Sequence, residues 1–185
     1  MGKNPKTGWN TRVLVFTALL VAMNIVLSRL LVIDLGFARI TVGSVCTILA
    51  GLWFGPAAGG ICGLTADILG CLLKGYAVNP LITAAAVVWG VLPALMRPLM
   101  SKAKKTKKIV ILCAGITVSS VISTLVLTTA GLVLMNGYNF YAIMPSRVLQ
   151  WAAMTPVHCI AVCAVYFSQI TGVIVNGNIQ GRRTA

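Results

Sequence analysis

The chain has 185 residues, of which 58% are hydrophobic and only 9% are charged, and its fifteen lysines and arginines stand against two acids, Asp34 and Asp67. Soluble domains carry about 25% charged residues, and disordered chains are poor in large apolar residues, so both classes are excluded. The composition predicts an all-α, polytopic membrane protein. At about 20 apolar residues for each crossing, a six-helix bundle with short loops forms one domain over residues 1–185.

Six apolar segments predict the transmembrane helices, because each extends over most of a bilayer crossing and ends near Gly, Pro or charged residues. In chain order they cover residues 13–33, 40–54, 57–73, 81–99, 109–135 and 147–170. The Gly/Pro-rich sequence FGPAAGG, residues 54–60, is a predicted turn, and residues 101–108 and 136–146 are predicted loops. Six crossings place both termini on the same side of the membrane.

Most of the positive charge lies on that side. Eleven of the fifteen lysines and arginines are near the two termini or within residues 97–108. Because cytoplasmic segments carry the excess of Lys and Arg, both termini are predicted to be cytoplasmic. Nucleic acid is not a predicted partner, because its binding requires an exposed basic surface rather than short clusters beside apolar segments.

The remaining four cations lie near the predicted outer ends of helices: Arg29, Arg39, Lys74 and Arg147. One interpretation is that these long side chains extend to the outer lipid interface. A charge near lipid is costly, however, and tends to be kept for a partner or a ligand. The four cations, together with Asp34, therefore favour an anion-binding mouth at the outer face.

The third apolar segment is rich in small residues and carries an acid. Asp67 lies on the same helix face as Gly63 and Gly70, by the three-and-four spacing of a helix. A carboxylate on a tightly packed face must find a hydrogen-bond donor. That donor is either an internal partner, such as Arg29 or Arg39, or the amino or ring N–H groups of a ligand.

The last segment has a second polar stripe. One helix face carries Arg147, Trp151, Met154 and His158, with Gln150 beside it. An arginine, an amide and an indole could bind a carboxylate and stack on a ring. Alternatively, Trp151 belongs to an interfacial aromatic belt and His158 is a hydrogen-bonded core residue. The preceding loop adds three aromatic residues that suit a lid or the lipid interface: Tyr138, Phe140 and Tyr141.

The first apolar segment contains Ala18 and Ala22, a spacing of small residues that permits close helix–helix contact in lipid. On an ideal α-helix these alanines lie nearly in line with Arg29. The same face would then contact a partner at one end and a ligand at the other.

Catalytic and energising motifs are absent from the sequence. It has no P-loop for a nucleotide and no Ser/His/Asp or HExxH grouping, and two acids with one histidine leave few acid–base groups. The six cysteines lie in apolar segments without a CxxC pair, which favours packing over a metal site or disulfides. Neither an enzyme nor a cofactor or metal is predicted.

Several short motifs resemble one known family. They are Arg29-Leu30, Arg39-Ile40-Thr41, Leu49-Ala50-Gly51, Phe54-Gly55-Pro56 and Asp67-Ile68-Leu69-Gly70, with Met144-Pro145-Ser146-Arg147 and Thr155-Pro156-Val157-His158 near the end. The pattern is similar to that of folate-family S components, the substrate-binding membrane subunits of energy-coupling factor (ECF) vitamin transporters. His158 stands where the resemblance predicts an acidic residue.

The resemblance implies a protein of the bacterial cell membrane that binds a folate-like vitamin from outside. It implies docking on a transmembrane coupling subunit through Ala18 and Ala22, with two cytoplasmic ATPases driving uptake by toppling of the S component in the lipid bilayer. The expected substrate-binding residues are Arg29, Arg39 and Arg147 for anionic groups, Asp67 for ring donors, Trp151 for stacking, and Gln150. The alternatives are an S component for another vitamin or precursor, a membrane scaffold without a ligand, and a small channel or membrane enzyme.

Overall fold

The computed structural model describes residues 11–30, 33–34, 39–101, 104–169, 171–172 and 174. The elements of that part are, in chain order, α1 (Thr11–Ile25), the π-helical segment η1 (Val26–Leu30), β1 (Ile33–Asp34), β2 (Arg39–Ile40), α2 (Ser44–Phe54), α3 (Pro56–Lys74), α4 (Pro80–Leu95), α5 (Arg97–Ser101), α6 (Lys105–Ser120), the π-helical segment η2 (Val121–Thr128), α7 (Thr129–Asn136) and α8 (Phe140–Tyr166).

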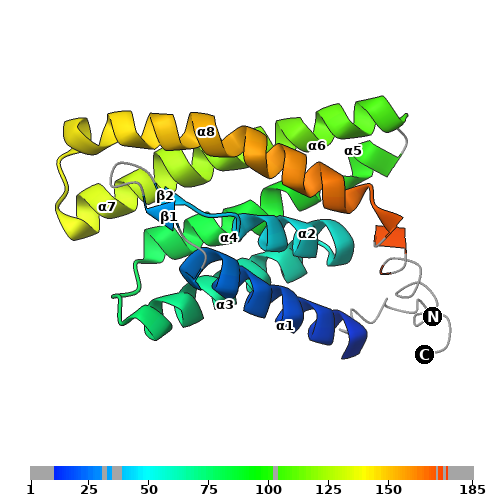
Figure 1. Cartoon of the computed structure of the whole chain (residues 1–185), viewed down its shortest axis with the longest axis horizontal. Coiled ribbons are helices and arrows are strands. Elements are labelled where there is room, and N and C mark those ends of the chain that lie inside the picture. The colour runs from blue at the N-terminus through cyan, green and yellow to red at the C-terminus, as the bar shows by residue number, and fades with distance from the viewer. Residues whose placement is uncertain are drawn as a thin grey trace, which may run out of the picture.

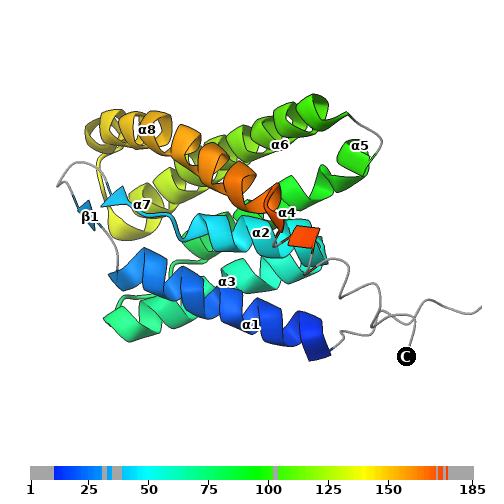
Figure 2. The same cartoon turned by 45° about the vertical axis from the view of Figure 1, so that its right-hand side comes forward.

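These elements form an elongated helical bundle. The helices run along its length, with α1 and α3 on one side and α6 and α8 on the opposite side, and α1 begins at the end of the bundle where α8 finishes (Figures 1 and 2). Five helices in the described residues are long and apolar enough to cross a membrane: Thr11–Arg29, Pro56–Lys74, Pro80–Met100, Thr106–Met135 and Phe140–Tyr166. The predicted all-α membrane fold is confirmed, whereas the cytoplasmic side of the termini stays a prediction.

The second helix is shorter than predicted. It begins at Ser44 rather than Ile40, because Arg39–Ile40 pairs antiparallel with Ile33–Asp34. The β-branched residues that follow Arg39 favour an extended backbone there. With 11 residues, α2 rises about 16 Å, roughly half the hydrocarbon thickness. Since nearly all of its side chains are buried, α2 is a core helix that the other helices surround.

Three other boundaries also differ from the predictions. The helix α6 begins at Lys105, within the predicted loop of residues 101–108. The helix α8 begins at Phe140 rather than at residue 147, because the side chain of Asn139 caps it by accepting the backbone N–H of Tyr141 at 3.0 Å. The predicted fourth helix breaks at Met96, since Pro98 cannot donate a backbone hydrogen bond to continue the ladder.

Glycines bring α2, α3 and α4 into backbone contact. A Cβ atom on Gly59 would lie 2.6 Å from the carbonyl oxygen of Gly90 and 2.7 Å from the Cα of Gly51. The turn between α2 and α3 also depends on a glycine, because Gly55 has φ of 111° directly before Pro56. Small residues at helix interfaces permit this close approach in membranes, where packing holds helices together.

Replacing Gly59 by alanine is therefore expected to destabilise the bundle by about 1–3 kcal/mol, the usual cost of overpacking. The added methyl group meets backbone atoms, which cannot move aside as a flexible side chain would. Thermal unfolding in detergent should show a lower midpoint temperature. The control is Gly172→Ala, where a Cβ atom has nothing within 4 Å; equal midpoints for the two variants would contradict the prediction.

Candidate ligand-binding cavity

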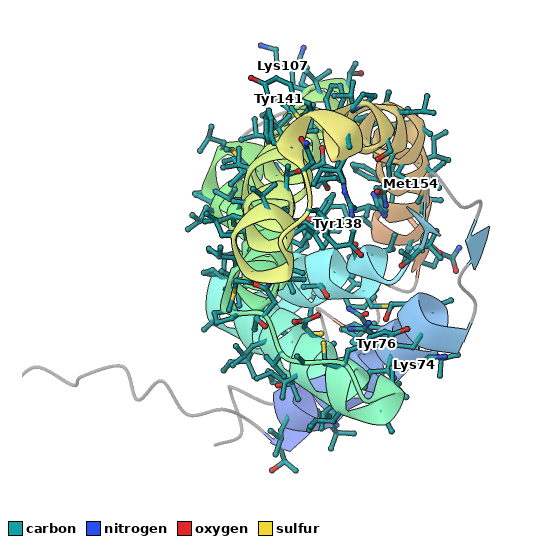
Figure 3. The ribbon with its side chains drawn as sticks, turned by 90° about the vertical axis from the view of Figure 1, so that its left-hand side faces the viewer. Lys74, Tyr76, Lys107, Tyr138, Tyr141 and Met154 are labelled. Atoms are coloured by element: carbon teal, nitrogen blue, oxygen red, sulfur yellow. The ribbon has the colours of Figure 1, made fainter. Side chains whose placement is uncertain are left out.

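A cavity of about 810 Å³ lies inside the bundle. Its walls come from α1, η1, α2, α3, α4, η2, α7 and α8, and from the segments before α2, between α3 and α4, and between α7 and α8. Figure 3 looks along the bundle from the end where α3 joins α4 and α7 joins α8. The volume falls within the range of about 300–1,000 Å³ that small-molecule sites occupy.

One wall of the cavity holds an ion pair. The Arg29 Nη2 lies 3.3 Å from the Asp67 Oδ1, and the two side chains are only 13% and 11% exposed. The other carboxylate oxygen of Asp67 accepts a hydrogen bond of 2.8 Å from the Thr83 hydroxyl. Both oxygens of Asp67 thus have protein partners, which supports the internal-partner interpretation of this residue.

Gly70 makes room for this pair. A Cβ atom at Gly70 would lie 2.5 Å from the Nε of Arg29, so a larger residue would displace the guanidinium. The small residues on this face of α3 therefore let Arg29 reach across from η1 to Asp67.

The opposite wall holds Arg147 and Gln150 from α8. The Arg147 Nη1 donates a hydrogen bond of 3.0 Å to the Gln150 Oε1, and both side chains line the cavity. Among the side chains that the structure describes, no carboxylate lies within ion-pair distance of Arg147. Since a guanidinium has five N–H donors, Arg147 has donors left for an anionic ligand.

A smaller recess of about 140 Å³ adjoins the cavity and shares Arg147 and Gln150 with it. Trp151 lines this recess rather than the main cavity. Its Nε1 donates to the Ser120 hydroxyl at 2.9 Å, and that hydroxyl donates to the Thr117 carbonyl at 2.8 Å. These bonds hold the indole ring as a wall of the recess.

Trp89 and Asn24 were not identified from the sequence as cavity residues. Trp89 lines both compartments and lies edge-on to His158, with ring centroids 5.1 Å apart. Asn24 lines the cavity and its Nδ2 donates a 2.6 Å hydrogen bond to the Thr47 hydroxyl. A polar amide inside an apolar segment is a recognisable signal, whereas the direction in which Trp89 faces depends on helix packing.

The other predicted site residues have different positions. Arg39 lies in β2 and its side chain, like that of Asp34, is outside the described part of the structure. Lys74 ends α3 and is exposed, and it does not line the cavity. Of the four outer cations, Arg29 and Arg147 are those that the structure places on the cavity walls.

Of the three candidate lid residues, one lines the cavity and two do not. Tyr138 lines the cavity, although it is 54% exposed, whereas Tyr141 is 85% exposed and projects outward from α8 (Figure 3). Phe140 and Tyr141 contact one another in the first turn of α8. Of the three, Tyr138 is positioned to cover the cavity.

Ala18 and Ala22 lie on the exposed face of α1, beside the larger exposed side chains of Leu19 and Met23. They do not line the cavity. The predicted conflict with Arg29 is removed because η1 is π-helical: its i→i+5 bonds rotate the residues that follow Ile25 relative to an α-helix. The alanines face outward and Arg29 faces the cavity.

Comparison with known proteins gives consistent matches. Residues 12–180 match the family described as "ECF transporter, substrate-specific component". The folate transporter FolT of Clostridium novyi (strain NT) is 30% identical over 152 residues, which cover 81% of this chain and 85% of the relative. A crystal structure of FolT bound with folic acid superposes with a TM-score of 0.68 at 24% identity, covering 84% of this chain and 93% of that one. This structural match shows a shared fold.

Proposed function

The chain belongs to the family of ECF transporter substrate-specific components, and from this premise we propose that it binds folate, or a closely related pterin vitamin, in the cavity between Arg29 and Arg147. As a member of this family it is a multi-pass protein of the bacterial cell membrane. Its proposed partners are a transmembrane coupling subunit and two ATPases, which supply the energy for uptake. The protein itself performs no chemistry on the vitamin and needs no cofactor.

The observation that carries the substrate proposal is the difference between the two arginines on opposite walls of the cavity. Asp67 neutralises Arg29, whereas Arg147 has no carboxylate partner among the side chains that the structure describes. Folate carries a glutamate with two carboxylates, and an arginine binds a carboxylate through two parallel N–H donors. Arg147, oriented by Gln150, is the proposed anion-binding group. The similarity to a folate transporter supports the same conclusion.

The remaining predicted residues fit this proposal in other roles. The pterin of folate is a flat, fused ring, and the indoles of Trp89 and Trp151 line the recess beside Arg147. Aromatic rings prefer offset-stacked or edge-to-face contacts with such a ring. We assign stacking to these indoles and a wall position to the Arg29–Asp67 pair. Arg39 remains a proposed contact for anionic groups.

Titration of the purified protein with folic acid tests the proposal. Because two tryptophans line the recess, binding should quench tryptophan fluorescence. Replacing Arg147 by alanine should weaken binding about 10- to 100-fold, the effect of losing a charge-assisted hydrogen bond of about 1.5–3 kcal/mol. The dissociation constant can be measured by calorimetry on the same samples.

Lys74→Ala is the matched control, because it removes the same charge from an exposed position outside the cavity wall. If both variants weakened folic acid binding equally, the overall positive charge of the protein would explain the effect, and a specific contact with Arg147 would not. Tight binding of another vitamin, with no response to folic acid, would overturn the substrate and keep the transport class. If no vitamin bound, the proposal would be wrong and the protein would be a membrane scaffold without a ligand.

A further inference from the structure

The recess ends at the only histidine of the chain. His158 is 4% exposed, and its Nε2 lies 3.3 Å from the backbone carbonyl oxygen of Thr41. The ring also packs edge-on against Trp89. Its other nitrogen, Nδ1, is buried and has no hydrogen-bond partner among the described residues.

The contact with Thr41 determines which nitrogen carries the proton. A carbonyl oxygen can only accept, so the Nε2 must donate. In a neutral imidazole the Nδ1 is then a bare acceptor. The neutral form is the favourable one here, because no acid lines the recess in the described structure and a buried, unpaired charge is costly. His158 therefore presents a buried acceptor that lacks a donor.

Three of the hydroxyl groups that line the recess already donate to backbone carbonyls. Ser120, Thr128 and Thr155 donate to the backbone carbonyls of Thr117, Ser123 and Trp151 at 2.8, 2.7 and 2.7 Å. A buried acceptor left unpaired costs about 1–3 kcal/mol, so such groups are normally satisfied by protein, water or ligand.

Asp67, the acceptor predicted for ring donors, is already occupied on both oxygens. The Nδ1 of His158, on the wall of the recess, is a buried acceptor that still lacks a donor. The recess volume of about 140 Å³ is comparable to an engineered cavity of about 150 Å³ that holds one benzene, so it can hold the end of a ring system but not a whole vitamin.

We infer that the Nδ1 of His158 accepts a hydrogen bond from an amino or ring N–H group of the bound vitamin, whose ring edge enters the recess between Trp89 and Trp151. The inference rests on the proposed function, and it adds a specificity rule. A ligand edge with N–H donors is favoured, whereas an edge with only acceptors would face the lone pair of Nδ1 and be rejected.

Two substitutions separate the two nitrogens. His158→Gln places an amide near the position of Nε2, so it can keep the bond to Thr41 but has no acceptor at Nδ1. His158→Asn places its amide oxygen near the position of Nδ1, so it keeps an acceptor there and loses the bond to Thr41. Each variant is titrated with folic acid and with two analogues, one lacking the 2-amino group and one methylated at N3.

We expect His158→Gln to weaken folic acid binding by roughly tenfold or more, and His158→Asn to weaken it less. For at least one analogue, the wild-type protein should bind less tightly than it binds folic acid, and His158→Gln should cause little further loss. Such non-additive losses would show that His158 and the altered N–H group of the ligand contact each other, which a purely structural role of His158 does not predict.

Equal losses for folic acid and both analogues in His158→Gln would overturn the inference, because the histidine would then act only on the fold. Unchanged binding of folic acid by His158→Gln would overturn it as well and would leave the proposed function standing. If His158→Gln fails to fold, the wild-type protein still decides the question: equal affinity for folic acid and both analogues overturns the inference. Failure of the wild-type protein to bind folic acid overturns the proposed function and this inference together.

Discussion

Replacing Asp67 by alanine is expected to cost about 3–5 kcal/mol of folding free energy, because it leaves the Arg29 guanidinium buried without its counter-charge. The pair has an Nη2–Oδ1 distance of 3.3 Å, and the Arg29 side chain is 13% exposed. The Thr83 hydroxyl would also lose the carboxylate oxygen to which it donates. The midpoint temperature of thermal unfolding in detergent should fall by more than it does for Gly59→Ala.

The double variant Arg29→Met with Asp67→Leu distinguishes structural pairing from ligand contact. Replacing both partners of a buried ion pair by apolar residues is often neutral, so this variant should recover most of the stability. Recovered stability with folic acid affinity close to that of the wild type would confirm that the pair forms a wall of the cavity. A recovered fold with a large loss of affinity would show that the pair contacts the vitamin, contrary to our expectation.

The sequence predicted the long helices well, because the bilayer imposes their length and apolar character. It was wrong about the start of α2, which begins at Ser44 and is surrounded by protein. A helix inside a bundle does not need to span the hydrocarbon layer, so the length rule for transmembrane helices does not apply to it. The π-helical segments were also not predicted, because hydrophobic periodicity cannot distinguish a local change in helical hydrogen bonding.

The charged residues of the site could be predicted from the sequence more readily than the aromatic residues. Arg29, Asp67 and Arg147 stand out because ionisable residues in apolar segments are costly. Pairing of Arg29 with Asp67 was one of two interpretations, and their contact supports it. The recess formed by Trp89 and His158 could not be predicted, because it depends on how separate helices turn toward one another.

Replacing both Ala18 and Ala22 by tryptophan is expected to abolish folate uptake by the reconstituted complex while leaving folic acid binding by the isolated protein unchanged. The two alanines are exposed beside the larger Leu19 and Met23 on the outer face of α1, and they are not part of the cavity wall. Two small residues four positions apart let a partner helix approach the backbone, and two indoles would prevent that approach. Uptake of radiolabelled folate into proteoliposomes containing the coupling subunit and both ATPases measures the effect.

The matched control places the same two indoles elsewhere on the lipid-facing surface, as Ala114→Trp in α6 with Ala153→Trp in α8. Both alanines are exposed, and α6 and α8 lie on the side of the bundle opposite α1 (Figures 1 and 2). Because these two positions lie away from the proposed docking face on α1, this control should bind and transport folate normally. Normal uptake by the Ala18/Ala22 variant would exclude this face as the docking surface. Equal loss of uptake in both variants would show that bulk anywhere on the bundle impairs its movement in the bilayer, so the loss could not be assigned to docking on α1.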